Sequence, residues 1–190
     1  MFRRIFLAGA AALLLAAGLA TTPTATAQQG RETRDLENTL YLDLEGGRVV
    51  IEMRPDLAPN HVARIKELVR EGFYDGIVFH RVIDGFMAQT GDPTGTGSGG
   101  SGKNLKAEFS LEQHVRGVVS MARAQSPDSG DSQFFIVYAD APWLDGQYTV
   151  WGKVTEGMEL VDALKKGTDS SGVVDDPDHI VKVQVAADAK

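Results

Sequence analysis

Residues 39–53 read TLYLDLEGGRVVIEM, and this stretch indicates the fold class. Apolar and polar side chains alternate on both sides of the pair Gly46-Gly47. Alternation is typical of a strand with one buried face, and a glycine pair between two such runs indicates a tight hairpin. The domain is therefore predicted to open with an antiparallel hairpin that packs one face on the core.

The patterns beyond this hairpin extend the same fold. Further β-type runs cover residues 77–82, 117–122, 134–138, 148–154 and 180–185. Apolar residues at helical spacing predict two helices, one from Pro59 to a stop at Gly72 and one over residues 158–166 with a stop at Gly167. Many short strands without βαβ alternation favour a mainly β fold, a closed or nearly closed antiparallel barrel, with the helices at its open ends.

The composition excludes several classes of function. The chain has 190 residues, no cysteine and a formal net charge of -7. Without cysteine it has no disulfide, thiolate metal site or cysteine nucleophile. An acidic chain lacks the basic surface that nucleic acids require, so we expect no nucleic-acid partner. The length suits one domain, which we place at residues 39–188.

Residues 1–27 have the pattern of a secretory signal peptide. Arg3 and Arg4 precede an apolar run over residues 5–20, and Ala25-Thr26-Ala27 has the spacing of a cleavage site. The alternative is an uncleaved anchor, but a membrane span needs about 20 strongly apolar residues and this run is shorter and rich in alanine. We expect cleavage after Ala27, a linker over residues 28–38, and a periplasmic or secreted protein without a further membrane segment.

Several motifs suggest chemistry that their context does not support. Residues 95–100 match the dinucleotide motif G-x-G-x-x-G, but Asp92-Pro93 stands before them where a strand is needed. The histidines are scattered, and residues 175–178 lack a calcium-loop pattern, so we expect an acidic turn and no metal or cofactor. A hydrolase is a weak hypothesis because Ser120, Ser129 and Ser132 lie in no nucleophile elbow, with no evident base beside them.

Residues 79–89 read FHRVIDGFMAQ and place one arginine among aromatic and apolar residues. The simplest interpretation is that Arg81 faces solvent from a strand. However, Arg81, Phe86, Met87 and Gln89 together supply a cation, two apolar walls and an amide. This combination is typical of a small apolar pocket with few polar anchors.

This segment resembles the signature of the cyclophilins, which are peptidyl-prolyl cis-trans isomerases. Four further stretches agree in order and spacing: GFYDG at 72–76, GVVSMA at 117–122, SQFFI at 132–136 and WLDG at 143–146. The match covers essentially all of residues 39–187. It implies a closed eight-stranded antiparallel β-barrel capped by two α-helices, and catalysis of rotation about X-Pro bonds.

The resemblance also implies the site residues. Arg81 would be catalytic, and His80 would orient the site. The proline ring would lie among four apolar side chains, Phe86, Met87, Phe135 and Leu144. Further substrate contacts would come from Gln89, Ala122, Arg123, Trp143 and Tyr148, and the loop 95–102 would flank a subsite for the residues before proline.

The chain departs from the family pattern at three places. Tyr148 stands where many members have histidine, Arg123 stands where asparagine is familiar, and residues 125–131 are one residue longer than in the eukaryotic pattern. Trp143 is the residue type that the family associates with sensitivity to cyclosporin-like macrocycles, so we expect such inhibitors to bind.

The chemistry implied by the resemblance needs no cofactor. An X-Pro amide must cross a barrier of about 18–20 kcal/mol because twisting removes its resonance. The twisted nitrogen regains a lone pair, so a donor aimed at it binds the twisted state better than either planar isomer. Arg81 is placed to be that donor, and its charge is permanent.

Two other functions are compatible with the sequence. A binding module or holdase could grip proline-containing segments in the same groove without turnover. A structural or adhesive β domain is supported only by the strand pattern. As an isomerase, the protein would act as a monomer on proline-containing peptides and unfolded exported proteins.

Overall fold

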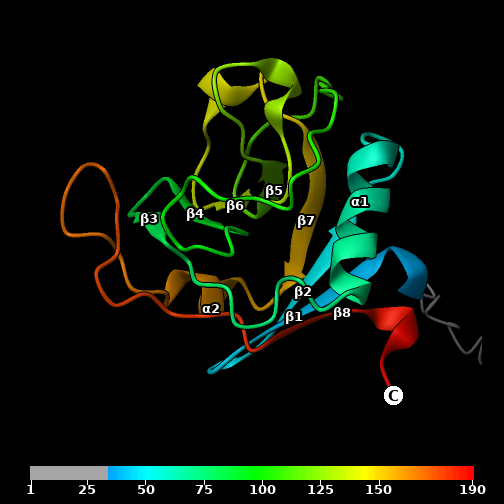
Figure 1. Cartoon of the computed structure of the whole chain (residues 1–190), viewed down its shortest axis with the longest axis horizontal. Coiled ribbons are helices and arrows are strands. Elements are labelled where there is room, and N and C mark those ends of the chain that lie inside the picture. The colour runs from blue at the N-terminus through cyan, green and yellow to red at the C-terminus, as the bar shows by residue number, and fades with distance from the viewer. Residues whose placement is uncertain (1–33) are drawn as a thin grey trace, which may run out of the picture. The chain divides into compact units, whose positions relative to one another are not determined.

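The computed structural model describes residues 34–190, which Figure 1 shows in colour. Within them, eight strands form one antiparallel sheet in the order β3-β4-β6-β5-β7-β2-β1-β8. The strands are β1 (Thr39–Leu44), β2 (Gly47–Met53), β3 (Arg81–Ile83), β4 (Met87–Thr90), β5 (Val118–Met121), β6 (Phe134–Val137), β7 (Val150–Glu156) and β8 (Lys182–Val185). The helices are α1 (Pro59–Arg70) and α2 (Met158–Asp162), with short 3-10 turns η1 (Leu36–Asn38), η2 (Pro127–Ser129), η3 (Pro142–Leu144) and η4 (Ala186–Asp188). The prediction of a mainly β fold with eight antiparallel strands and two helices is confirmed.

The opening hairpin forms as predicted, but its turn begins one residue before the glycine pair. Leu44 lies opposite Gly47, so Glu45 and Gly46 form the turn and Gly47 is already the first residue of β2. Leu40, Leu42 and Leu44 are buried, whereas Tyr41 and Asp43 between them are only half buried. The apolar face therefore points into the core, as the alternation predicts.

The sheet curls without closing, so the prediction of a closed barrel is wrong in this respect. β3 and β8 are its two ends, and no strand ladder joins them in the part of the chain that the structure describes. The chain before β3 instead meets the chain before β8 at one isolated bridge, between Val78 and His179. Residues 167–174 cover the outer edge of β3. Irregular backbone thus satisfies edge groups that a paired strand would satisfy in a closed barrel.

The strands of the next hairpin, β3 and β4, also differ from the prediction. β3 begins only at Arg81, within the expected run 77–82, and β4 was not predicted as a strand. The turn between them contains Asp84-Gly85, a hairpin dipeptide whose glycine has φ of 69°. The strands that follow from this turn place Arg81 opposite Gln89.

The second helix is shorter than its apolar spacing suggests. It ends at Asp162, although the prediction extended it to residue 166. The Lys165 amide donates to the Asp178 carboxylate at 2.7 Å, and the Gly167 amide donates to the Val82 carbonyl at 2.9 Å. These tertiary bonds satisfy amides that a longer helix would have satisfied itself.

Helix α1 begins at Pro59 as predicted and buries His61, Val62, Ile65, Leu68 and Val69. Its N-terminal amides are satisfied from a distant part of the chain, because the Glu108 carboxylate accepts from Asn60 N at 3.1 Å and from His61 N at 3.0 Å. Burial alone would raise the pKa of Glu108, but the bonds from His61 and Asn60 outweigh it and lower that pKa. Glu108 therefore serves as a remote cap for a helix that follows Ala58, which has no capping group.

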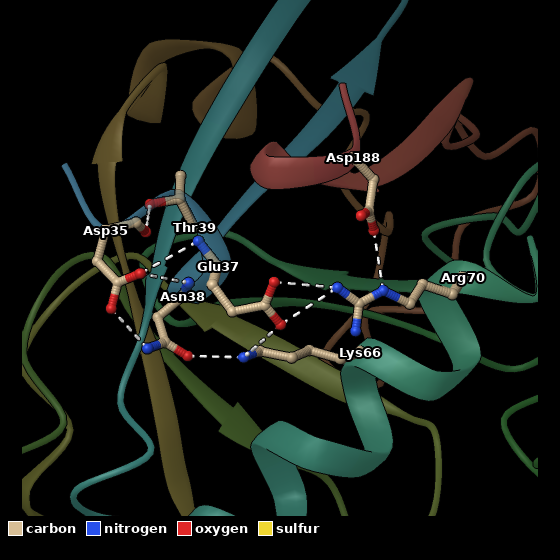
Figure 2. Close-up of polar contacts among 7 residues, drawn as sticks. All are labelled: Asp35, Glu37, Asn38, Thr39, Lys66, Arg70 and Asp188. Carbon is tan, nitrogen blue, oxygen red and sulfur yellow. Dashed lines mark hydrogen bonds and ion pairs between the residues drawn. The ribbon is translucent and has the colours of Figure 1, made fainter. Parts of the chain in front are cut away.

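The first described residues are tied to α1 and to η4 (Figure 2). Asp35 caps η1 by accepting from the amides of Glu37 and Asn38. Glu37 then pairs with Lys66 and Arg70, and Arg70 also pairs with Asp188 at 2.9 Å. The predicted signal peptide and residues 28–33 of the predicted linker lie outside the described residues, so the domain boundaries stay predictions. No helix within residues 34–190 has the length and apolar character needed to cross a membrane.

Candidate active site

A pocket of about 230 Å³ opens where the β3–β4 hairpin meets β5, β6 and η3. It brings together nine of the eleven residues predicted from the sequence: Arg81, Phe86, Met87, Gln89, Ala122, Arg123, Phe135, Leu144 and Tyr148. His80 and Trp143 do not line it. The pocket combines two arginines and one amide with apolar walls, which suits a small apolar group attached to a polar chain.

Arg81 enters the pocket from β3 with two of its three guanidinium nitrogens already bonded. Its Nε donates to the Ser171 carbonyl at 2.8 Å, and its Nη1 donates to Gln89 Oε1 at 3.3 Å. The third nitrogen, Nη2, has no hydrogen-bond partner among residues 34–190. Arg81 therefore retains a donor for a ligand while its orientation is fixed.

The apolar walls of the pocket are rigid because their side chains are also part of a packed cluster. Met87, Phe135 and Leu144 are all buried, with at most 7% of their surface exposed. The rings of Phe135 and Tyr148 meet edge to face with centroids 5.7 Å apart. The packed side chains therefore form an apolar cavity whose shape exists before any ligand binds.

Two of the three departures from the pattern, Arg123 and Tyr148, contact each other. The Arg123 guanidinium lies over the Tyr148 ring, 4.6 Å from its centroid. Arg123 Nε donates to the Gln147 carbonyl, and its Nη1 donates to the Ala124 carbonyl, both at 3.0 Å. Arg123 and Tyr148 thus form one wall of the pocket together, held by cation–π attraction and backbone bonds.

Trp143 stands at the rim. Its side chain is exposed, and its ring lies 5.7 Å from the Phe86 ring at an angle of 46°. The exposed indole extends the apolar surface of Phe86 beyond the pocket mouth.

A residue without a predicted role, Gln133, connects this pocket to the glycine-rich loop. Gln89 Nε2 donates to Gln133 Oε1 at 2.9 Å, and Gln133 Nε2 donates to the carbonyls of Gly97 and Gly99. Gln133 also lines a second hollow of about 630 Å³, together with parts of the loop and with Ala122, Arg123, Ser129 and Asp131. The sequence signal was its position in the stretch SQFFI, next to the buried β6.

Comparison with known proteins identifies the family. Residues 39–185 match the family described as "Cyclophilin type peptidyl-prolyl cis-trans isomerase/CLD". The chain belongs to this family. Its function is peptidyl-prolyl cis-trans isomerisation, in agreement with the names of its relatives.

Known proteins are similar to this chain in both sequence and structure. A "Probable peptidyl-prolyl cis-trans isomerase" of Brucella suis is 50% identical over 100% of this chain and 99% of its own length. Peptidyl-prolyl cis-trans isomerase B of Bacillus subtilis is 46% identical over 67% of this chain and 90% of its own. A crystal structure of a Cryptosporidium parvum cyclophilin-type isomerase, in the presence of the dipeptide Ala-Pro, superposes with a TM-score of 0.72. It is 32% identical and covers 77% of this chain and 98% of its own.

His80 lies beside the cyclophilin pocket but outside its lining. Only 6% of its surface is exposed, and neither ring nitrogen has a hydrogen-bond partner within the described residues. Burial, the main cause, lowers the pKa of His80. The imidazole is therefore neutral at pH 7. Its ring packs beneath the glycine-rich loop next to Gly97, outside the pocket lining.

The glycine-rich loop of this cyclophilin folds around the carboxylate of Asp92. Asp92, which is 1% exposed, accepts from the amides of Thr94, Gly97 and Gly99 at 2.7, 2.6 and 3.0 Å. Burial opposes its ionisation, but these bonds outweigh it and lower the pKa of Asp92 to about 2. Successive loop amides often bind a phosphate. Here Asp92 occupies that position, which explains the motif without a nucleotide.

The structure corrects the expectation that Ser120 has no base beside it. His114 Nε2 lies 3.0 Å from Ser120 Oγ, and His114 Nδ1 lies 2.9 Å from Asp145 Oδ1. These contacts match the connectivity of a serine-hydrolase triad. However, Ser120 is fully buried and also bonds the Thr149 carbonyl at 3.0 Å. A substrate cannot reach it, so the three side chains support the cyclophilin pocket, where the His114 ring stacks on Phe135.

Proposed function

We propose that Arg81 catalyses the isomerisation by donating a hydrogen bond from Nη2 to the prolyl nitrogen of a twisted X-Pro bond. The observation that supports this proposal is the free Nη2 on a guanidinium whose other two nitrogens are held by Ser171 and Gln89. The planar amide nitrogen shares its lone pair with the carbonyl and is a poor acceptor. The bond therefore strengthens only as the amide twists, and this difference lowers the barrier.

The pocket would bind the substrate as well as activate it. Phe86, Met87, Phe135 and Leu144 would surround the proline ring, and Gln89 would anchor a substrate carbonyl. The backbone of Ala122 and Arg123 would pair with the extended peptide, while Tyr148 would donate from its phenol. Since the rings and Met87 are already packed, the pocket needs little rearrangement to accept proline.

Trp143 would extend this groove for larger ligands. Its exposed ring beside Phe86 suits the apolar face of a cyclosporin-like macrocycle. A calorimetric titration with such a macrocycle should show binding at micromolar concentration. The absence of heat would contradict this part of the proposal.

The biological role proposed here is the folding of exported proteins. It is supported by Arg3 and Arg4, the apolar run 5–20 and the cleavage pattern that ends at Ala27. N-terminal sequencing of the protein from fractionated cells should give a chain that starts at Gln28, outside the cytoplasm. A cytoplasmic protein that retains residues 1–27 would contradict export.

The Arg81→Ala variant tests the catalytic proposal. Removal of one transition-state donor costs on the order of 10²–10³ in rate, so exchange of an X-Pro peptide measured by NMR should slow by about this factor. Arg48→Ala is the control, because Arg48 is a surface arginine paired with Asp43. Exchange at the wild-type rate in Arg81→Ala would reject the role of Arg81. If the slow variant still prevents aggregation of an unfolded protein, the groove also serves as a holdase.

A further inference from the structure

We propose that residues 167–174, which we call the clamp segment, position the Arg81 guanidinium for catalysis. This inference rests on the proposed role of Arg81 as donor and adds positioning residues that lie outside the pocket. It explains why an irregular segment, rather than β8, covers the edge of β3.

The clamp segment is attached to β3 on both sides of Arg81. The Val82 amide donates to the Gly172 carbonyl at 2.7 Å, and the Gly167 amide donates to the Val82 carbonyl at 2.9 Å. The Val174 amide donates to the His80 carbonyl at 3.1 Å. Three backbone bonds therefore fix the segment to the residues immediately before and after Arg81.

The clamp segment also makes the shorter of the two bonds to the Arg81 side chain. Ser171 accepts from Nε at 2.8 Å, whereas Gln89 accepts from Nη1 at 3.3 Å. Because a guanidinium is planar, a bond at Nε restricts the direction of Nη2. The Ser171 carbonyl thus determines where the free donor points.

Two neighbours hold the Ser171 carbonyl in place. Asp169 Oδ1 accepts from Ser171 N at 2.8 Å and from Ser171 Oγ at 2.5 Å. Gly172 has φ of 74° and packs so closely on β3 that an added Cβ would overlap Ile83 Cγ1 and lie 3.2 Å from the Val82 carbonyl. A side chain at residue 172 would therefore push the clamp segment, and the Ser171 carbonyl with it, away from β3.

The experiment uses Gly172→Ala and Asp169→Ala, with Gly76→Ala as the matched control. Gly76 has φ of 81° and no atom within 4 Å of an added Cβ, so its variant carries the backbone strain without the overlap. Misplacement of a catalytic group by about 1 Å can cost up to about 10²-fold in rate. We expect X-Pro exchange to slow roughly ten- to hundredfold in Gly172→Ala and less in Asp169→Ala, with the peptide dissociation constant unchanged. Asp169→Asn, which keeps an acceptor, should recover most of the rate lost in Asp169→Ala.

An NMR signal reports on the clamp directly. The Nε–H resonance of Arg81, assigned by its loss in Arg81→Ala, should exchange slowly with water in the wild type and faster in both clamp variants. The proposal would be overturned if both clamp variants isomerised the peptide at the wild-type rate. It would also be overturned if they catalysed slowly while the Nε–H signal stayed unchanged. If Arg81→Ala itself catalyses at the wild-type rate, the proposed role of Arg81 fails instead. Asp169 is exposed, so its variants decide the matter even if Gly172→Ala does not fold.

Discussion

At the residue scale, the site places a permanent charge beside a neutral histidine. Arg81 supplies the proposed donor, and its neighbour in sequence, His80, is buried with both ring nitrogens unpartnered in the described residues. A guanidinium stays protonated throughout the neutral pH range. Catalysis and folding should therefore respond differently to pH.

The rate of isomerisation is predicted to be independent of pH between about 6 and 9, because arginine titrates only above about 12. Exchange rates of one X-Pro peptide at several pH values would check this. A bell-shaped profile in this range would show that a titrating group takes part and would contradict the proposed mechanism.

Stability, in contrast, should fall as the solution becomes acidic. Because the pKa of His80 is lowered in the folded protein, the unfolded chain binds a proton first as pH falls below about 6.5. The free energy of unfolding should then drop by up to about 1.4 kcal/mol per pH unit from this group alone. Urea unfolding of His80→Gln should show a shallower drop between about pH 7 and 5. The same change at the exposed His179 is the control, and an equal slope in both variants would contradict the prediction.

At the element scale, the loop 94–102 shows how a motif can be real and yet misleading. The letters G-x-G-x-x-G do mark amides that converge on an anion, but the anion is Asp92. The sequence pattern was sufficient to reject a nucleotide site because a strand and a helix were lacking. It could not identify Asp92 as the ligand, because that depends on how the loop folds back on itself.

Asp92→Asn should destabilise the loop while keeping its size. The pKa of about 2 lies well below the usual value for aspartate, so ionised Asp92 contributes roughly 2 kcal/mol that is lost as pH falls from about 4 to 2. Urea unfolding of Asp92→Asn at neutral pH should show a loss of this order. Asp175→Asn, at an exposed aspartate, should show almost none. Equal stabilities of the two variants would contradict the proposed role of the Asp92 carboxylate.

At the scale of the whole molecule, the sequence predicts the parts that depend on short-range pattern. The hairpin of β1 and β2, the start of α1 and nine pocket residues follow from alternation, Pro59 and the motifs. The open edge at β3, the early end of α2 and the His114–Ser120 contact do not follow. They depend on bonds such as Gly167 to Val82, whose partners are far apart in sequence and are brought together only by the completed sheet.

The ion pairs that join the two ends of the described chain (Figure 2) are predicted to matter little. Arg70 contacts Glu37 and Asp188, but all three side chains are about half exposed, so solvent screens the pairs. Arg70→Ala should lower the free energy of unfolding by less than about 1 kcal/mol. A loss of several kcal/mol in urea unfolding would show that this network is a major support of the fold.

The most direct test of the central claim is a crystal structure of the wild-type protein with a bound X-Pro peptide. The claim predicts a proline ring between Phe86, Met87, Phe135 and Leu144, with Arg81 Nη2 the side-chain donor nearest to the prolyl nitrogen and Nε still bonded to Ser171. A guanidinium turned into solvent, with the proline bound elsewhere, would contradict it.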